Sequence, residues 1–544
     1  MNRRLYFLLL AYCLMQQGYG QGRYDVVVYG ASPAGITAAI QVARMGKTVA
    51  LVEPSSRAGG IMVDGLGGSD INNQSFRNSA AIGGLALEFH ARVARHYGRE
   101  EAFARAIKIP PDNNRVWRYE PHIAEKIFRE WLSEFANIEV FYNHRLVESA
   151  DAVVKEGARI VSFTTEQGDV FKGRLFIDAT LEGDLLYRAG VSMVIGRESN
   201  DTYKETLNGI RAETTHSQFN VRVDPYRIMG DPSSGLIPTI QNEELGIPGE
   251  GDHRIQAFCF RLCLTDSADN QIPFRKPGNY DRNLYEIYAR FERAGGVFQK
   301  PVASIPNRKT DLGAWTELSH NLYGMNHEYP GGAYATREAI YRDHLFFTQG
   351  LFYFLSHDSS LSEQTRRNWR QWGLAKDEFS DNNGWPRSLY IRDGRRMVSD
   401  YVITEHHTRR ENPVVSNDPV AMAYWPPDVH SVRRIVRDGY AYNEGFVFGG
   451  AHWRPFGIAY RSLVPKKEEC ANIITPTCPS SSHIAYGAIR IEFTFMALGQ
   501  AAGTAAVLSL RTNRPVQELK YRRIKKRLLR DNQVIAIPED QITY

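Results

Sequence analysis

The hydrophobic pattern near the start of the chain predicts a β-α-β unit. Residues 24–29 form an apolar, mostly β-branched run, typical of a strand buried on both faces of a parallel sheet. Residues 30–45 predict a turn and a helix that ends at Gly46, and residues 48–52 predict a second strand. A parallel α/β fold therefore begins here.

The turn between the first strand and the helix has the residue types of a dinucleotide-binding turn. Gly30 permits a tight turn and Gly35 lets the helix press against the strand, so that free amides at the helix start face a pyrophosphate. Ser32 stands where the motif usually has its second glycine, and Glu53 is placed to accept a hydrogen bond from a ribose hydroxyl. The predicted cofactor-binding residues of this unit are Gly30, Ser32, Pro33, Ala34, Gly35 and Glu53.

A glycine pair after this unit favours FAD over NAD as the dinucleotide. Gly59 and Gly60 follow Ala58, and such a pair lets the backbone run close beside a flat ring system. No second strand, glycine turn and helix of this kind occurs later in the chain. We therefore predict FAD as the cofactor and no separate nicotinamide domain.

Short β-rich runs between residues 138 and 178 predict a strand, a small antiparallel meander and a return strand. Gly157 and Gly168 interrupt them, and Val147 in the second run is a candidate cofactor contact. The runs are residues 138–143, 145–149, 158–165 and 169–178.

The last long apolar pattern predicts a helix over residues 490–510. Gly499 and Gly503 lie four residues apart and predict a small face for close packing on the sheet. A loop of small residues, 480–487, precedes the helix, and we place Gly487 in this loop among the cofactor-binding candidates. A positive helix start after this loop would stabilise a reduced, anionic flavin.

Two longer motifs resemble those of the FAD-dependent oxidoreductases, a family with exported bacterial members. One is Ile-Asp-Ala-Thr-x-x-Gly-Asp over residues 177–184, and the other is residues 480–503, SSSHIAYGAIRIEFTFMALGQAAG. The resemblance implies that Thr180 and Asp184 lie near the FAD phosphates or ribityl chain, and that the second motif contacts the flavin. Asp393-Gly394 departs from the family pattern, so no role is predicted for this acid. Further stretches resemble the family in the same order: residues 65–70, 117–124, 254–265, 309–311, 395–397, 428–430 and 460–465.

The middle of the chain predicts an inserted substrate domain. Its aromatic stretches are joined by long irregular connections, and residues 345–356 predict a helix whose aromatic residues either pack in a core or stack on a substrate, with core packing favoured. The fold class is thus α/β, a Rossmann-like FAD-binding domain of parallel sheet plus β-meander with an inserted α+β substrate or cap domain. The predicted division is signal peptide 1–20, FAD-binding domain 21–213 and 441–515, substrate domain 214–440, and helical tail 516–544.

Two histidines and two arginines are the candidate catalytic residues. His430 lies on the segment that returns to the FAD domain and His483 lies in the small-residue loop. Either imidazole suits removal of a proton from a hydroxyl or amine during hydride transfer. Arg461 and Arg490 are candidates for binding a carboxylate or steadying the flavin, and salt bridges within the fold are the alternative.

The charged residues and the cysteines limit the classes of ligand and partner that the chain is expected to bind. The 66 basic and 61 acidic residues give a net charge of +5 without a long block of one sign, so a small-molecule substrate is favoured over nucleic acid. The basic cluster at residues 520–530 is interpreted as a solvated helix face. No CxxC motif or metal-ligand cluster stands out, and Cys470 and Cys478 are interpreted as buried thiols, with a disulfide as the alternative.

The first 20 residues predict export. Arg3 and Arg4 precede the apolar stretch 5–15, and residues 18–20 form a small-x-small cleavage site. We expect a periplasmic or secreted protein without an integral membrane segment after signal removal. The leading hypothesis is an FAD-dependent dehydrogenase or oxidase acting on a small organic substrate, with a carbohydrate-derived alcohol as the first guess. The alternatives are a flavin-dependent reductase or desaturase, and a non-catalytic carbohydrate-binding protein that retains the fold.

Overall fold

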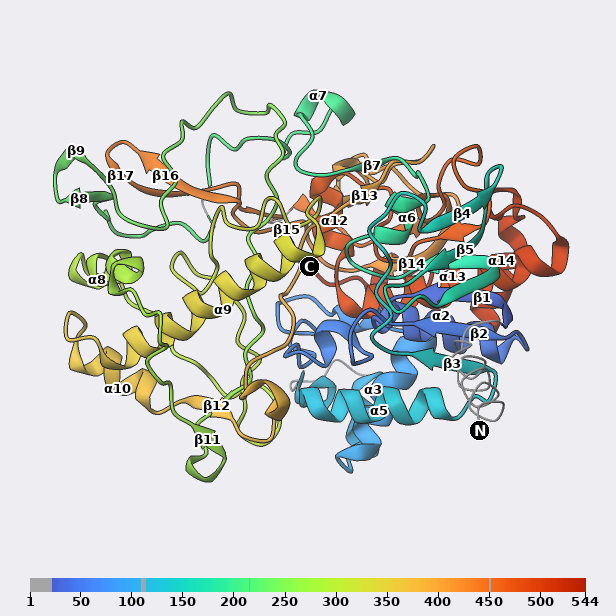
Figure 1. Ribbon diagram of the computed structural model, residues 1–544, viewed down its shortest axis with the longest axis horizontal. Helices are drawn as coiled ribbons and strands as arrows, with labels where there is room; N and C mark the ends of the chain where they lie inside the picture. Colours follow the sequence, from blue (N-terminus) through green and yellow to red (C-terminus); the bar gives the residue numbers. More distant parts are fainter. Residues whose placement is uncertain (1–21, 109–113, 215, 450–451) are drawn as a thin grey trace, which may run out of the picture.

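A computed structural model describes residues 22–108, 114–214, 216–449 and 452–544. The predicted signal segment, including Cys13, lies outside these residues. The chain forms a sheet domain and an inserted domain beside it, which are the right and left halves of the view in Figure 1.

A seven-stranded sheet is the frame of the sheet domain. Its strand order is β3-β2-β1-β6-β5-β4, and β20 also pairs with β6. The first four strands of this order and β20 are parallel, whereas β5 and β4 form the antiparallel meander. The strands are β1 Arg23–Tyr29, β2 Val49–Val52, β3 Ile138–Phe141, β4 Val153–Glu156, β5 Arg159–Thr164, β6 Val170–Asp178 and β20 Ile473–Ile474.

The predicted β-α-β unit is confirmed. Strand β1 ends in four residues that are at most 1% exposed, as expected for a strand covered on both faces. Helix α2 (Pro33–Arg44) follows it, with Met45 as its C-terminal cap, and β2 pairs in parallel with β1.

The meander differs from the prediction at one strand. Residues 145–149 contribute only an isolated bridge, between Leu146 and Thr165, and the edge strand is β4 instead. The side chains of β4 alternate between buried Val153 and exposed Val154. The run 145–149 instead carries the chain from the parallel edge across to the meander.

The glycine face of helix α13 (Glu492–Thr512) packs on α2, and the prediction that it packs on the sheet is wrong. A Cβ added to Gly499 would lie 2.1 Å from the carbonyl oxygen of Ala34, and one added to Gly503 would lie 2.5 Å from that of Ala38. Among the described residues α13 alone is long and apolar enough to cross a membrane, contrary to the expectation that no such segment exists. Its most apolar window is 94% buried in the fold, so it is a core helix.

The predicted small-residue loop is partly helical. Residues 483–489 form α12 (His483–Ile489), and the Ser482 hydroxyl accepts a hydrogen bond from the Ala485 amide at 3.2 Å. Ser482 is therefore an N-cap. The chain then turns at Arg490 and Ile491 before α13 begins, so two helices replace the predicted loop and single helix.

Other helices cover the sheet domain. The basic cluster forms α14 (Tyr521–Arg530), which buries Ile524 and Leu528, so it is an amphipathic helix with a solvated basic face. Cys259, Cys263, Cys470 and Cys478 are free and buried. The remaining helices and short strands that carry the chain around the sheet domain are α3 Gly84–His96, α4 Glu100–Ala106, α5 Pro121–Ser133, α6 Asp184–Arg188, α7 Asn200–Tyr203, α11 Glu405–Thr408, β7 Met193–Val194, β13 Arg396–Met397, β14 Pro419–Ala423, β15 Asp428–Val429, β18 Val447–Phe448 and β19 Phe456–Ala459.

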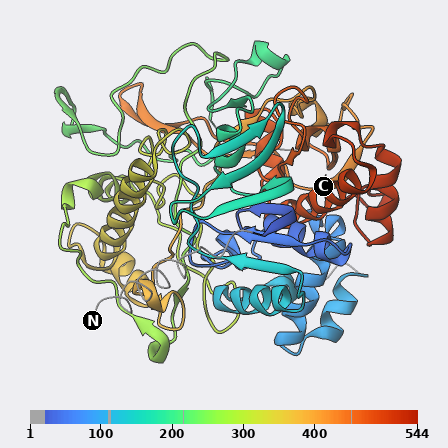
Figure 2. The same ribbon diagram turned by 45° about the vertical axis from the view of Figure 1, so that its right-hand side comes forward.

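The inserted domain has its own apolar core. Its long helix, α9 (Tyr334–His357), contributes to this core, and Figure 2 shows the helix beside the sheet domain. Phe347, Phe352 and Phe354 of α9 are at most 3% exposed within it, which confirms core packing for these aromatic residues. Ile403 and β14 belong to the core of the sheet domain, although the predicted division places them in the inserted segment. The elements of the inserted domain are α8 Glu286–Arg293, α9 Tyr334–His357, α10 Glu363–Arg370, β8 Tyr226–Ile228, β9 Asp231–Leu236, β10 Leu264–Thr265, β11 Gln271–Ile272, β12 Gly373–Ala375, β16 Arg433–Arg437 and β17 Tyr440–Glu444.

Candidate functional site

The turn between β1 and α2 is closed by backbone contacts that leave no room for side chains. Gly30 has a φ of 93°, and a Cβ on Gly35 would lie 1.9 Å from the Gly30 carbonyl oxygen. The Ser32 hydroxyl accepts from the Gly35 amide at 3.3 Å and donates to the Ala179 carbonyl at 2.6 Å. Serine at the second glycine position thus caps α2 and ties the turn to the end of β6.

Glu53 holds the next loop against this turn. Its carboxylate accepts from the Ala31 amide at 2.6 Å and the Ser55 amide at 2.7 Å. Burial raises the pKa of Glu53 to about 7, although these hydrogen bonds act in the opposite direction. The carboxyl group lies at the carboxyl end of β2, where a parallel sheet places its ligands.

A cavity of about 260 Å³ opens in front of this turn, and we call it the glycine-turn cavity. Backbone and small side chains form most of its sheet-domain wall, and the inserted domain supplies the opposite wall. Such a backbone-lined space at a helix N-terminus fits the pyrophosphate of a dinucleotide. The residues that line this cavity include Gly30, Ser32, Glu53, Gly60, Ile61, Thr180, Leu389 and Ile391.

Several predicted cofactor residues contribute to the walls behind this cavity. Pro33 and Ala34 form the first turn of α2 with Gly35. A Cβ on Gly59 would lie 2.3 Å from the Cγ1 atom of Val63, so this glycine permits close packing under the loop. The Gly59 amide also donates to the Ala31 carbonyl at 2.8 Å.

Val147 and Asp184 lie outside the described residues that line the glycine-turn cavity. The Val147 amide donates to the Thr164 carbonyl in the meander. The Asp184 carboxylate forms ion pairs with Arg337 at 2.6 Å and Arg395 at 2.7 Å. Asp184 therefore ties α6 to the inserted domain, a structural position that the family motif did not predict.

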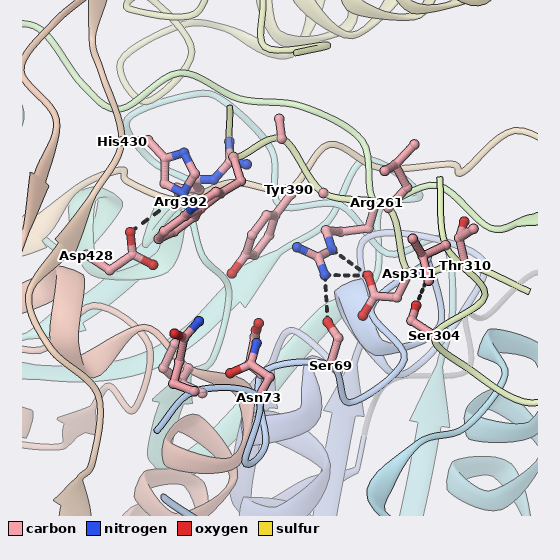
Figure 3. A pocket seen from close by; sticks show the side chains of 18 of the residues that line it. Ser69, Asn73, Arg261, Ser304, Thr310, Asp311, Tyr390, Arg392, Asp428 and His430 are labelled. Carbon is pink, nitrogen blue, oxygen red and sulfur yellow. Dashed lines mark hydrogen bonds and ion pairs between the residues drawn. The ribbon is translucent and has the colours of Figure 1, made fainter. Parts of the chain in front are cut away.

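A second cavity, of about 370 Å³, lies between the two domains (Figure 3). We call it the arginine cavity because four guanidinium groups line it, together with three carboxylates, two indoles, a phenol and an imidazole. These side chains are Arg118, Arg261, Arg392, Arg490, Asp70, Asp311, Asp428, Trp315, Trp425, Tyr390 and His430.

His430 lines this cavity beside Asp428 and Trp315. Its Nε2 atom lies 3.7 Å from Oδ1 of Asp428, and its ring packs edge-on against Trp315. Burial lowers the pKa of His430 well below its usual value, and the nearby Arg392 and Arg490 lower it further. The environment of the imidazole thus favours its neutral form.

Arg490, just before α13, is hydrogen-bonded to two residues of the arginine cavity, Tyr390 and Asp428. Its guanidinium donates to the Tyr390 hydroxyl at 3.0 Å and to the Asp428 carbonyl at 2.8 Å. A Cβ on Gly487 would lie 2.9 Å from the same carbonyl oxygen. Gly487 therefore lets α12 approach β15 closely and sets the position of Asp428 relative to Arg490.

The structure separates His483 from His430. His483 is 1% exposed, and its Nδ1 atom lies 2.8 Å from Oδ2 of Asp393. Asp393 also pairs with Arg396 at 2.9 Å, and Arg396 pairs with Glu198 at 2.8 Å. Asp393, for which no role was predicted, is thus part of a buried charge network.

Arg461 also lies apart from the two cavities. It pairs with Asp418 at 3.1 Å, and its side chain is 51% exposed. The described residues that line the two cavities do not include His483 or Arg461. Of the four candidate catalytic residues, the fold brings together His430 and Arg490.

Most residues of the arginine cavity could not be predicted from the sequence. Arg118, Arg261 and Asp311 fall within stretches that resemble the family, but their spacing alone did not assign them a role. Tyr390 and Trp315 gave no signal. Their side chains meet only because loops from both domains converge at this point.

One group of described residues has the ligand types of a metal site, which the sequence did not predict. Glu120, His122 and Asp377 bring their ligand atoms within 4.8 Å of one another. The ammonium group of Lys309 lies 2.7 Å from both carboxylates and 2.8 Å from Glu378. A side-chain cation therefore already pairs with the carboxylates of this cluster.

The two cavities share a wall. Leu389 and Ile391 line the glycine-turn cavity, whereas Tyr390 and Arg392 line the arginine cavity. In an extended segment, successive side chains point to opposite sides, so each side of residues 389–392 faces a different cavity. The cavities are consequently neighbours on either side of one segment of the inserted domain.

Comparison with known protein families gives a match along nearly the whole chain. The family described as FAD dependent oxidoreductase matches residues 25–528. None of the curated proteins compared with the chain matches it.

Solved structures resemble only part of the chain. T. acidophilum thioredoxin reductase is 15% identical over 35% of this chain and 39% of its own, with a TM-score of 0.18. The pqsL protein, a probable FAD-dependent monooxygenase from Pseudomonas aeruginosa, is 16% identical over 32% of this chain and 48% of its own, with a TM-score of 0.21. L-proline dehydrogenase from P.horikoshii is 15% identical over 32% of this chain and 58% of its own, with a TM-score of 0.24. The matched segment thus spans between 39% and 58% of these three proteins.

The glycine turn, the return strand β6 and the family match along nearly the whole chain lead to one conclusion. The chain belongs to the FAD-dependent oxidoreductase family and uses FAD as its cofactor.

Proposed function

We propose that the protein is a dehydrogenase or oxidase that oxidises a small organic alcohol, and that the arginine cavity binds this substrate. The shared wall carries the proposal, because it places a cavity rich in polar side chains next to the cavity with the dinucleotide-binding turn. The indoles of Trp315 and Trp425 offer apolar faces on which a sugar ring can stack, which supports a carbohydrate-derived substrate.

In this proposal, residues of the glycine turn hold the cofactor. The amides at the start of α2 face the diphosphate, and Glu53 accepts from a ribose hydroxyl. Bound FAD supplies a two-electron acceptor for hydride.

The residues of the arginine cavity orient the substrate and take its proton. His430 accepts the hydroxyl proton at a ring nitrogen while the carbon loses its hydride, and the alcohol becomes a carbonyl. Asp428, 3.7 Å away, stabilises the imidazolium that forms. Arg490 holds Asp428 and Tyr390 in place through the hydrogen bonds described above.

Anaerobic reduction of the bound flavin tests this proposal. The purified holoenzyme is mixed with candidate alcohols, and bleaching of the flavin absorbance is followed over time. Bleaching by an alcohol supports oxidation. Bleaching only by a nicotinamide donor, followed by reoxidation with an alkene or carbonyl compound, would support the reductase or desaturase alternative instead.

We also propose that the protein is exported to the periplasm or secreted, because residues 1–20 have the composition of a signal peptide. N-terminal sequencing of the protein from its host tests this proposal. A mature chain that starts after Gly20 would support it, and an intact Met1 would contradict it.

A further inference from the structure

The four guanidinium groups of the arginine cavity differ in how their charge is compensated. Arg261 pairs with Asp311, with 2.7 Å between Nε and Oδ1. Arg490 donates to the Asp428 carbonyl at 2.8 Å and lies 3.4 Å from its carboxylate. Arg392 donates to a backbone carbonyl, to an amide oxygen and to a sulfur atom.

Arg118 lacks such partners. The residue is 5% exposed, yet its Nε and Nη1 atoms have no hydrogen-bond partner among the described residues. Asp311 and Asp70 influence it only from beyond ion-pair distance, and burial lowers the pKa of Arg118 in spite of them. A guanidinium nevertheless stays charged in proteins. Burying a cation without a partner is costly, which indicates that its partner arrives with a ligand.

The backbone on either side of Arg118 is anchored in the core. Trp117 and Tyr119 on either side are at most 1% exposed in the core of the sheet domain. The Tyr119 amide donates to the Gly67 carbonyl at 3.1 Å, and a Cβ on Gly68 would lie 2.6 Å from the Trp117 carbonyl. The two buried aromatic residues anchor this segment while Arg118 lines the cavity.

The position of Arg118 defines one end of the arginine cavity. Figure 3 shows Arg261, Asp311 and Ser69 on one side of Tyr390, and His430 on the other side. Arg118 belongs to the Asp311 end, because the amide of the next residue, Tyr119, donates to the Gly67 carbonyl and the Gly67 amide donates to the Asp311 carboxylate at 2.9 Å. The unpaired cation is thus at the far end from the proposed base.

We propose that the substrate carries an anionic group, a carboxylate in the simplest case, which pairs with Arg118 at this end of the cavity. The inference rests on the proposed function, since it names the substrate class for the same site. A planar guanidinium binds a carboxylate through two parallel hydrogen bonds. The carboxylate is held there while the hydroxyl to be oxidised lies at the His430 end, which describes a hydroxy acid or a sugar acid.

Matched pairs of acids and neutral alcohols test the charge requirement. The holoenzyme is titrated in a calorimeter with D-glucuronate and D-glucose, and with lactate and propane-1,2-diol. We expect each acid to bind at least 10-fold more tightly than its neutral counterpart. Arg118→Met should weaken acid binding by at least 100-fold and leave the neutral compounds unaffected, and Arg118→Lys should restore part of the affinity.

Stability separates a ligand-binding cation from a structural one. Without ligand, we expect Arg118→Met to have a Tm equal to or above that of the parent, because it removes an uncompensated buried charge. Arg261→Met is the matched control, since it leaves Asp311 buried without its partner and should lower the Tm. Both variants are expected to retain FAD.

The outcomes distinguish the inference from the proposed function. Acids that bind through Arg118 without bleaching the flavin would leave the inference standing and contradict the proposed function. Bleaching by neutral alcohols, with no tighter binding of acids, would support the proposed function and contradict the inference. A lower Tm or a loss of FAD in Arg118→Met, together with equal acid affinity in parent and variant, would overturn the inference.

Discussion

The glycine-turn cavity and the arginine cavity share a wall but are built in different ways. Backbone atoms and small residues at the ends of β1, β2 and β6 form most of the sheet-domain wall of the first cavity, and only 1.9 Å separates the Gly30 carbonyl oxygen from a Cβ added to Gly35. Charged and aromatic side chains from segments far apart in the sequence make the second. The glycine turn is thus shaped by its backbone to receive the cofactor, whereas in the function that we propose the arginine cavity recognises the substrate through side-chain charge.

The largest expected effect is on the glycine-turn cavity alone. Gly35→Val places a branched side chain where even a Cβ meets the Gly30 carbonyl, so the turn should open and FAD should be lost. The ratio of flavin to protein after purification measures this loss. Gly46→Ala is the control within the same unit, because its Cβ would meet nothing within 4 Å. It should keep FAD at a cost of about 1 kcal/mol for its positive φ. A Gly35→Val protein with full flavin content would contradict the assignment of the turn.

The next effect is on the arginine cavity. His430→Ala should lower the rate of flavin reduction by about 10²- to 10⁴-fold and leave FAD bound, because it removes the proposed base. His483→Ala should instead destabilise the fold by about 2 to 3 kcal/mol, because it takes away one partner of the buried Asp393. Stopped-flow reduction and urea unfolding measured on both variants separate the two roles. If His483→Ala alone stopped flavin reduction in a stable protein, the assignment would be reversed.

The glycine turn and the two histidines differ in how much of their structure can be predicted from the sequence. The turn and its helix were predicted with their boundaries because each depends on residues within one β-α-β unit. His430 and His483 were equivalent candidates, since the sequence does not reveal that α12 turns His483 toward Asp393. Arg118 and Tyr390 depend on loops that converge from two domains, and local periodicity carries no information about such contacts.

Acid should weaken the inserted domain, which supplies one side of the arginine cavity. Burial lowers the pKa of His344 and of His327 to about 4 each. An unfolded histidine titrates near 6.5, so between these two values the unfolded chain binds more protons than the folded one. The free energy of unfolding therefore falls as the pH decreases from about 6.5, by about 3 kcal/mol per histidine near pH 4. Urea unfolding at several pH values measures the slope. His344→Gln should reduce that slope, and an unchanged slope would exclude His344 as a source of it.

The smallest expected effect tests the close packing of α12 on β15. Gly487→Ala adds a Cβ 2.9 Å from the Asp428 carbonyl, so β15 must shift by a few tenths of an ångström. We expect flavin reduction to slow by about 10-fold with FAD retained, since small misplacements of catalytic groups are costly. Gly278→Ala, with open space around its Cβ, is the control and should reduce flavin at the parent rate. Equal rates in both variants would show that the position of Asp428 does not limit the reaction.

The central claim is that the two cavities are the cofactor half and the substrate half of one active site. A crystal structure of the protein with FAD bound tests it most directly. The account predicts the diphosphate at the start of α2 and the flavin ring at the wall formed by residues 389–392, in contact with the arginine cavity. Electron density that places the flavin ring away from this wall, with His430 out of reach, would contradict it.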